Sequence, residues 1–289
     1  MRPLFAAGAA LLLLAGGPAR PSGHLLIVGG GEQPEALVRR FVELAGGPGK
    51  ARIVVVPMAS SEPAATGEEK AADLRALGAD ASVLLLTRAQ AESAGSARAL
   101  DQVTGIWFTG GDQVPLAEAL RATPVLEAMR ARYQAGAVIG GTSAGAAIMS
   151  DSMLTGNQRR PDSLGYYGDD YDGIRRDYIQ IVPGLGFLHG AVVDQHFLRR
   201  ERHNRLLSVV LERPTLLGVG IDEGTALEVE PDGTWLVLGR SAVMIYDARA
   251  ARVTPAGATV LGTTGIRMHL LPAGSRFDPR RGTATLPRP

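Results

Sequence analysis

Apolar runs and helical repeats alternate along the first half of the chain. Short apolar runs that end at glycine, proline or a polar turn are typical of buried strands, and they occupy residues 24–28, 52–56, 82–86, 105–109 and 137–139. Between them, apolar residues recur every three or four positions, which predicts helices over residues 34–44, 68–77 and 114–132. Continuous apolar strands separated by helices favour a parallel sheet covered on both faces. We therefore expect an α/β fold with a doubly wound, mostly parallel sheet.

The pattern changes after residue 150. Residues 155–177 are polar and rich in Gly, Asp, Arg and Tyr, which predicts a long surface loop. A strand, a helix and a strand are expected next, over residues 191–194, 197–211 and 216–221. From residue 225 to 262 the apolar runs are short and separated by turns, which predicts C-terminal antiparallel hairpins added to the main sheet. Because no linker or repeat interrupts the chain, we expect residues 20–289 to form one domain.

The N-terminus has the pattern of a secretory signal peptide. Arg2 supplies a positive charge, an apolar stretch follows, and the small residues Gly17 and Ala19 precede a possible cleavage site. The alternatives are a buried helix or a membrane anchor, but the apolar stretch is shorter than the roughly 20 residues that a spanning helix needs. We expect cleavage after Ala19, a secreted or periplasmic protein, and no membrane contact after cleavage.

The composition excludes several kinds of chemistry. The chain has 289 residues and a net charge of +1, so no overall field attracts it to nucleic acid. It contains no cysteine, which excludes a disulfide framework, a Cys-ligated zinc, an iron–sulfur cluster and a Cys nucleophile. A nucleophile, if the chain has one, must therefore come from another residue type.

Ser143 is the candidate nucleophile. It lies in a glycine-rich turn between an apolar strand and a helical stretch, in the order Gly140-Gly141-Thr142-Ser143-Ala144-Gly145. A G-x-S-x-G turn in this context exposes the serine hydroxyl above the edge of the sheet. The N–H of Ala144 could then stabilise an oxyanion, and the pair Gly110-Gly111, which ends a neighbouring strand, could supply a second N–H. The alternative is a glycine turn used only for close packing.

A serine nucleophile needs a base and an acid that orients it. His196 follows an apolar strand, which would bring it to the same sheet edge as Ser143. Glu223 also follows an apolar strand, with Asp222 as its rival. The order Ser, His, Glu differs from the Ser, Asp or Glu, His order of the α/β-hydrolases. A metal held by His189, His196 and His203 is disfavoured, because no single helix face presents all three; we expect no metal.

Arginines cluster beside His196. The cluster consists of Arg199, Arg200, Arg202 and Arg205. Guanidinium groups bind carboxylates with two parallel hydrogen bonds, which suggests a substrate that carries carboxylates. The alternative is a solvated helix face.

Together, these segments resemble the cyanophycinases. The matching pieces are Phe108-Thr109-Gly110-Gly111-Asp112-Gln113, Gly141-Thr142-Ser143-Ala144-Gly145-Ala146, Pro183-Gly184-Leu185-Gly186, Asp194-Gln195-His196-Phe197 with its arginines, and Ile221-Asp222-Glu223. This family belongs to a group of serine peptidases that also contains dipeptidase E. Its fold is similar to that of class I glutamine amidotransferases, with serine in place of their cysteine.

The resemblance implies a substrate and a set of roles. The substrate is cyanophycin, a polymer of aspartate with arginine attached to each side chain, and the product is a β-aspartyl-arginine dipeptide. Ser143 acts as nucleophile, His196 as base and Glu223 as orienting acid, while the N–H groups of Gly111 and Ala144 stabilise the oxyanion. Residues implied to shape the substrate pocket are Gln113, Asp194, Gln195, Arg200, Arg202 and Arg205.

The same resemblance implies a homodimer without a cofactor. Asp194, or an acid among residues 169–172, could meet the substrate's guanidinium group. The loop with Tyr166, Tyr167, Asp169, Asp170 and Asp172 is longer than expected for the family. Two other functions stay open: a peptidase of the same fold that acts on other isoaspartyl or acidic peptides, and an exported binding protein without catalysis.

Overall fold

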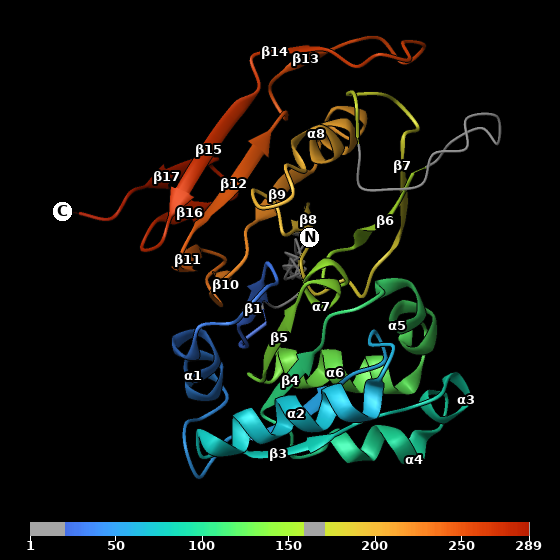
Figure 1. Ribbon diagram of the computed structural model, residues 1–289, viewed down its shortest axis with the longest axis vertical. Coiled ribbons are helices and arrows are strands. Elements are labelled where there is room, and N and C mark those ends of the chain that lie inside the picture. The colour runs from blue at the N-terminus through green and yellow to red at the C-terminus, as the bar shows by residue number, and fades with distance from the viewer. Residues whose placement is uncertain (1–20, 159–170, 289) are drawn as a thin grey trace, which may run out of the picture.

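A nine-stranded sheet forms the centre of the computed structural model, which describes residues 21–158 and 171–288. Within this part of the chain the strands lie in the order β17-β16-β11-β10-β1-β5-β4-β2-β3 (Figure 1). The predicted signal peptide, residues 1–19, and the middle of the predicted loop, residues 159–170, lie outside the described residues.

Five strands of this sheet run parallel to one another. They are β1 (Leu25–Val28), β5 (Val138–Thr142), β4 (Gly105–Phe108), β2 (Arg52–Val56) and β3 (Asp80–Val83). All residues of β1, β4 and β5 are buried, as their continuous apolar sequence predicts. The prediction of a strand over residues 82–86 is wrong in its bounds, because β3 starts and ends earlier. This strand lies at the edge of the sheet, where most of its residues are only partly buried or exposed.

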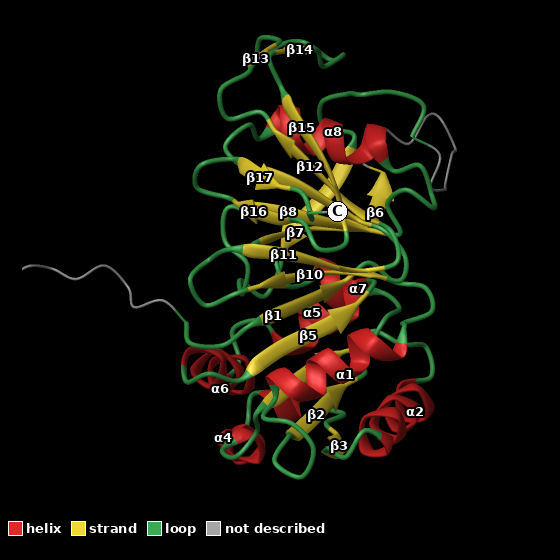
Figure 2. Cartoon of the chain, turned by 90° about the vertical axis from the view of Figure 1, so that its left-hand side faces the viewer, coloured by secondary structure: helices red, strands yellow, loops and turns green. Residues whose placement is uncertain are grey.

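Helices cover both faces of the parallel strands, which confirms the doubly wound prediction. One face packs against α1 (Glu35–Leu44) and α2 (Pro63–Ala76), and the other against α5 (Gln113–Leu120) and α6 (Pro124–Gln134). Figure 2 shows α2 and α6 on opposite sides of the strands. Side chains of β1 alternate accordingly, since Leu26 and Val28 join the core under α1 while Leu25 and Ile27 join the other.

The helix predicted over residues 114–132 is two helices, α5 and α6. Thr123 begins α6, and its hydroxyl accepts a hydrogen bond from the N–H of Leu126 at 3.2 Å. Pro124 occupies the first helical position, where a missing N–H is harmless. Short helical turns that the pattern did not predict precede β4, namely α3 (Arg88–Ala91), α4 (Ala94–Ala97) and η1 (Arg98–Leu100).

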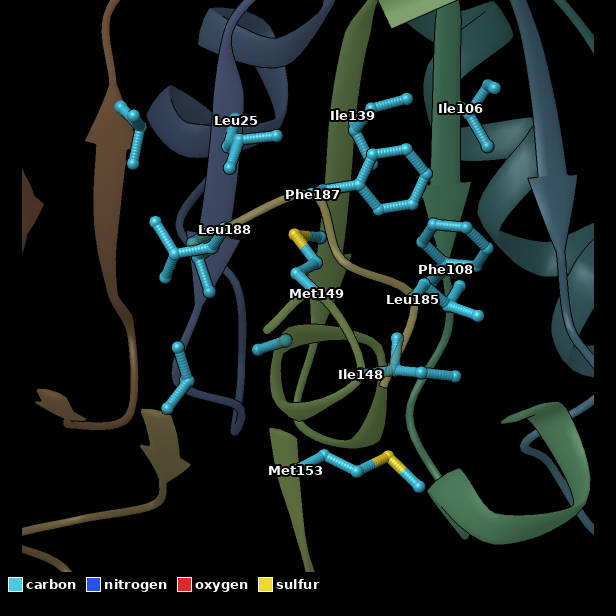
Figure 3. Packing of buried hydrophobic residues seen from close by; sticks show 14 of the residues in the cluster. Leu25, Ile106, Phe108, Ile139, Ile148, Met149, Met153, Leu185, Phe187 and Leu188 are labelled. Carbon is cyan, nitrogen blue, oxygen red and sulfur yellow. The ribbon is translucent and has the colours of Figure 1, made fainter. Parts of the chain in front are cut away.

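The core on the α5 and α6 face supports the turn that follows β5. Figure 3 shows Phe187 beside Ile139, Leu188 beside Met149 and Leu185 beside Phe108, all in one buried cluster. The ring centroid of Phe187 lies 5.8 Å from that of Tyr133. This packing buries the short helix α7 (Ala144–Ala147), so the residue before it has a fixed position.

The C-terminal strands divide between two sheets, whereas the sequence pattern predicted hairpins on the main sheet only. Strands β10 (Thr225–Val229), β11 (Trp235–Gly239), β16 (Arg276–Asp278) and β17 (Thr283–Thr285) extend the main sheet beyond β1 as antiparallel neighbours. A second sheet contains β8 (Ala191–Gln195), β9 (Leu217–Ile221), β12 (Ala242–Asp247) and β15 (Arg267–Pro272). Residues 222–224 cross from the second sheet to the main one.

Two predictions between residues 150 and 212 need correction. The segment 155–177 is not simply a surface loop: β6 (Ser152–Gln158) pairs with β7 (Ile179–Pro183), and Tyr171 and Tyr178 are buried. The helix predicted over 197–211 begins later, as α8 (His203–Glu212), because residues 197–202 form turns. The short strands β13 (Arg252–Val253) and β14 (Thr263–Thr264) pair with each other. Val260, which lies between them in the chain, forms a single β-bridge with Arg175.

In residues 21–158 and 171–288, no helix has both the length and the apolar character needed to cross a membrane.

Candidate active site

Ser143 lies in a sharp turn between β5 and α7. Its φ of 54° is in the left-handed region, which a residue with a side chain seldom adopts. Its N–H donates to the carbonyl of Val28 at 3.1 Å, so the turn is held against β1. A Cβ on Gly145 would lie 2.3 Å from the carbonyl oxygen of Phe108, which explains why the motif needs a glycine there. The strained turn presents the hydroxyl at the carboxyl edge of the sheet.

His196 and Glu223 complete a hydrogen-bonded row with Ser143. His196 follows β8, and its Nε2 lies 2.9 Å from Ser143 Oγ. Its Nδ1 lies 2.6 Å from Glu223 Oε1. Because an ionised carboxylate can only accept, Nδ1 carries the ring proton and Nε2 is left to accept the proton of the serine hydroxyl. The arrangement has the geometry that a general base needs toward a nucleophile.

Asp222, the rival acid, is bound elsewhere. Its Oδ1 accepts the N–H of Arg199 at 2.9 Å, and its Oδ2 accepts the hydroxyl of Ser241 at 2.7 Å. These bonds hold the crossing between the two sheets, while Glu223 turns toward His196.

The glycine turn after β1 also belongs to this site, although the sequence pattern did not predict it. Gly29 to Gly31 follow β1, and the carbonyl of Gly29 accepts the N–H of His196 at 2.7 Å. A Cβ on Gly30 would lie 2.4 Å from the His196 ring, and one on Gly31 would lie 2.8 Å from Glu223 Oε2. The signal was present as three successive glycines after a strand, but the sequence did not say what lay against them.

We expect Gly30→Ala to lower kcat about 100-fold, because a displacement of the base by about 1 Å has effects of that size. Gly47→Ala is the matched control, since Gly47 also has a positive φ, 84°, but nothing lies within 4 Å of its added Cβ. The control should lose stability on the order of 1–2 kcal/mol and keep its kcat. Equal kcat values for the two variants would contradict this role of Gly30.

The pKa of His196 is lowered from its ordinary value. Burial is the main cause, because it disfavours the charged ring, and the positive charges of Arg200 and Arg202 lower the pKa further. The hydrogen bond and the charge of Glu223 oppose the shift without cancelling it. His196 therefore stays neutral, and able to accept a proton, at lower pH than an exposed histidine.

A base that must be neutral loses activity as the pH falls through its pKa. We expect the acidic limb of kcat/KM to lie below pH 6.5, the ordinary value for histidine. Arg200→Gln should move this limb to higher pH by removing a charge that lowers the pKa. Arg199→Gln is the control, because Arg199 is not among the charges that act on His196. A limb that stays in place in Arg200→Gln would contradict this assignment.

The predicted oxyanion donors belong to residues next to Ser143 or next to its neighbour Gly110. Ala144 is the first residue of α7, so its N–H is one of those without a partner inside the helix. Gly111 lies in the turn between β4 and α5, and a Cβ on the preceding Gly110 would lie 3.4 Å from the Cβ of Ser143. The N–H of Ala144 thus starts the helix after the serine, and that of Gly111 follows a glycine that lies close to the serine.

Four of the predicted pocket residues pair with one another behind His196. Arg205 Nε donates to Asp194 Oδ2 at 2.9 Å, a second guanidinium nitrogen donates to Oδ1, and both residues are 1% exposed. Arg202 donates to the carbonyl of Gln195 at 2.8 Å and also to its side-chain oxygen. Asp194 raises the pKa of Arg205 against the opposing effect of burial. In each pair the arginine thus binds a residue of β8, just before His196 in the chain.

The other predicted residues lie in different surroundings. Arg200 is exposed, and its N–H donates to the carbonyl of His196 at 2.9 Å. Gln113 is buried and donates to the carbonyl of Leu154 at 2.6 Å. Asp172 accepts the hydroxyl of Tyr178 at 2.8 Å. The remaining loop residues of the sequence prediction lie outside the described residues, namely Tyr166, Tyr167, Asp169 and Asp170.

The other two histidines considered as metal ligands have separate partners. His189 Nδ1 lies 2.8 Å from Asp151 Oδ1, and His203 Nδ1 lies 2.8 Å from the hydroxyl of Tyr246. Across the described ranges, no three His, Cys, Asp or Glu residues come together in a way that could hold a metal ion.

Comparisons with known proteins find cyanophycinases among the relatives of this chain. The chain is 36% identical over 263 residues to a cyanophycinase of Trichormus variabilis, covering 88% of this chain and 84% of that one. It is 34% identical over 264 residues to a cyanophycinase of Geminocystis herdmanii, covering 88% and 93%.

Solved structures show the same fold. A crystal structure of a peptidase from an acI-B1 actinobacterium matches 88% of this chain and 98% of its own, with a TM-score of 0.63 and 24% identity. A putative peptidase E from Listeria monocytogenes matches 76% and 99%, with a TM-score of 0.52 and 19% identity. The family model of peptidase family S51 matches residues 25–237, and the chain therefore belongs to this family of serine peptidases.

Proposed function

We propose that this peptidase hydrolyses cyanophycin to β-aspartyl-arginine dipeptides through Ser143, His196 and Glu223. The observation that carries the mechanism is the row of hydrogen bonds, 2.9 Å from Ser143 to His196 and 2.6 Å from His196 to Glu223. The likeness to curated cyanophycinases over 88% of the chain supports the substrate.

Acylation begins with transfer of the Ser143 proton to His196 Nε2. The serine oxygen attacks the backbone carbonyl of an aspartyl residue, and the new oxyanion accepts N–H bonds from Gly111 and Ala144. Glu223 holds the ring proton at Nδ1 and stabilises the imidazolium that forms. His196 then gives its Nε2 proton to the leaving amine, which departs and leaves an ester on Ser143.

Deacylation uses the same residues, with a water molecule as the nucleophile and Ser143 as the leaving group. His196, again neutral, takes a proton from a water molecule whose oxygen attacks the ester carbonyl. The ester C–O bond breaks, and His196 returns the proton to Ser143. The buried position of His196 suits this step, because its low pKa keeps the ring neutral between the two half-reactions.

Electrostatics of the pocket suit an acidic substrate. In the proposal, Arg200 meets a substrate carboxylate directly, because it is exposed beside His196. The pairs Arg205–Asp194 and Arg202–Gln195 stabilise the turns between β8 and α8, which include Arg200. Gln113 positions β6 through its bond to Leu154.

The test is incubation of the purified protein with insoluble cyanophycin, followed by mass spectrometry of the soluble products. Release of β-aspartyl-arginine, with no cleavage of casein or of dipeptides with N-terminal aspartate, supports the proposal. Cleavage of isoaspartyl or acidic peptides without release from cyanophycin would support the alternative peptidase. Binding without any turnover, and without labelling by a serine-directed phosphonate, would support a binding protein.

We further propose that the chain is exported with cleavage after Ala19 and acts as a homodimer. The support for export is the N-terminal sequence pattern, and the support for the dimer is the family resemblance. Sequencing the N-terminus of protein recovered from outside the cytoplasm tests the first. Sedimentation of the purified protein tests the second, and a monomer at all concentrations would contradict it.

A further inference from the structure

A cleft of about 370 Å³ lies beside the turn that contains Ser143, on the face of the sheet that α1 and α2 cover. Its wall includes Thr142 and Gly110, which adjoin Ser143, and Gly31, which lies against Glu223. The arginine pairs lie elsewhere: Asp194 and Gln195 belong to β8 of the second sheet, and their arginine partners follow it in the chain. The cleft is therefore separate from the arginine pairs and lies next to residues that adjoin Ser143.

Three buried polar atoms on this wall lack hydrogen-bond partners in the described part of the chain. They are Trp107 Nε1, Thr109 Oγ1 and Thr142 Oγ1, in residues that are 1%, 3% and 8% exposed. Leaving such a group unpaired costs about 1–3 kcal/mol, so three beside one cleft need an explanation. An indole N–H only donates and a hydroxyl can donate, so all three suit a ligand that carries an acceptor such as a carboxylate.

Lys70 adds a positive charge to the same wall. Its side chain is 13% exposed, and its Nζ lies 3.1 Å from both Gln33 Oε1 and Asp73 Oδ2. Nζ also lies 5.5 Å from the centre of the Trp107 ring. An ammonium group has three donors, so these two bonds leave one for a ligand next to the Trp107 indole.

The lining as a whole carries more negative than positive charge. Glu32, Glu69 and Asp73 line the cleft together with Lys70. Carboxylates in this number favour a ligand that also carries a cation. The cleft therefore suits a molecule with a carboxylate for the donors on the wall and a positive group for the acids.

We propose that this cleft is a substrate subsite that binds an arginyl group by its carboxylate and its guanidinium. The inference rests on the proposed function, because an arginine joined to cyanophycin through its α-amino group keeps both of these charges. The carboxylate meets Lys70, Trp107 Nε1 and the two threonine hydroxyls. The guanidinium meets Glu32, Glu69 and Asp73.

The indole N–H signal of Trp107 reports binding directly. Trp107 and Trp235 are the tryptophans of the chain, so the ¹⁵N-labelled protein should give two indole signals, and Trp107→Phe assigns them. Titration with Nα-acetylarginine should move the Trp107 signal downfield in a saturable way and leave that of Trp235 in place. Acetylagmatine, which lacks the carboxylate, and Nα-acetylcitrulline, which lacks the positive charge, should bind at least about fivefold more weakly.

Thr109→Val separates a binding role from a structural one. The substitution should weaken Nα-acetylarginine roughly tenfold and leave the unfolding midpoint unchanged or higher, because it removes an unpaired buried hydroxyl. Thr123→Val is the matched control: Thr123 is 1% exposed but caps α6 with its hydroxyl, so the variant should lose stability and keep its affinity.

A Trp107 signal that does not move, or unchanged affinity in both Thr109→Val and Lys70→Met, would overturn the subsite. Either result leaves the proposed function standing if the wild-type protein releases dipeptides from cyanophycin. Failure to release dipeptides overturns the proposed function instead, and the titration still decides whether the cleft binds an arginyl group.

Discussion

Ser143→Ala is expected to lower kcat for release of dipeptides from cyanophycin by about 10⁴-fold or more. The substitution removes the only atom placed to form an acyl-enzyme in the row with His196 and Glu223. Far-UV circular dichroism and the unfolding midpoint should be unchanged, because the variant removes one oxygen atom from the turn. Activity within tenfold of the wild type would contradict the mechanism.

Because the serine and the base act as one unit, the double variant Ser143→Ala/His196→Ala should be no slower than either single variant. Glu223→Gln should lower kcat on the order of 10³-fold, because an amide cannot hold His196 in the same tautomer as firmly as a carboxylate. Asp222→Asn is its matched control, since Asp222 bonds to Arg199 and Ser241. Equal losses in the two acid variants would contradict the assignment of Glu223.

Asp194→Asn is expected to lower the free energy of unfolding by about 3–5 kcal/mol. The variant keeps the shape of the side chain but leaves the guanidinium of Arg205, which is 1% exposed, without its counter-charge. Arg202 lies 3.9 Å from the same carboxylate, so two positive charges would face a neutral amide. Urea unfolding followed by fluorescence measures the loss.

Two controls separate the buried pair from ordinary surface charge. Glu127→Gln breaks an exposed pair with Arg130, and it should change stability by less than about 1 kcal/mol. Asp194→Leu combined with Arg205→Met should recover most of the loss, because an apolar pair replaces an ionic one. A double variant less stable than Asp194→Asn would show that the loss comes from packing.

The parallel part of the fold and one half of the site could be predicted for the same reason. His196 and Glu223 each follow an apolar run, and the carboxyl ends of their parallel strands β8 and β9 meet at one edge of the second sheet. The strand pattern does not show that this edge faces Ser143, which follows a strand of the main sheet. The break between α5 and α6 was also readable, since Thr123 and Pro124 form a helix start inside a periodic stretch.

Other features depend on contacts between distant residues. Nothing in the strand pattern shows that β12 pairs with β9 in a second sheet while β10 pairs with β1. A run of arginines does not show which ones are buried, and here the spacing places Arg202 and Arg205 inward and Arg199 and Arg200 outward. The need for glycine at position 30 comes from the ring of His196, which is distant in sequence and lies against it.

The pairing of β9 with β12 makes the sheet that carries the base depend on a late part of the chain. His196 and Glu223 follow β8 and β9, and β9 is held on its other side by β12 (Ala242–Asp247), which is made later. When synthesis has reached residue 239, the segment with Ser143 has been made, but the sheet that carries the base lacks its third strand. The second sheet therefore gains its third strand only after a further 104 residues, from Ser143 to Asp247, have been synthesised.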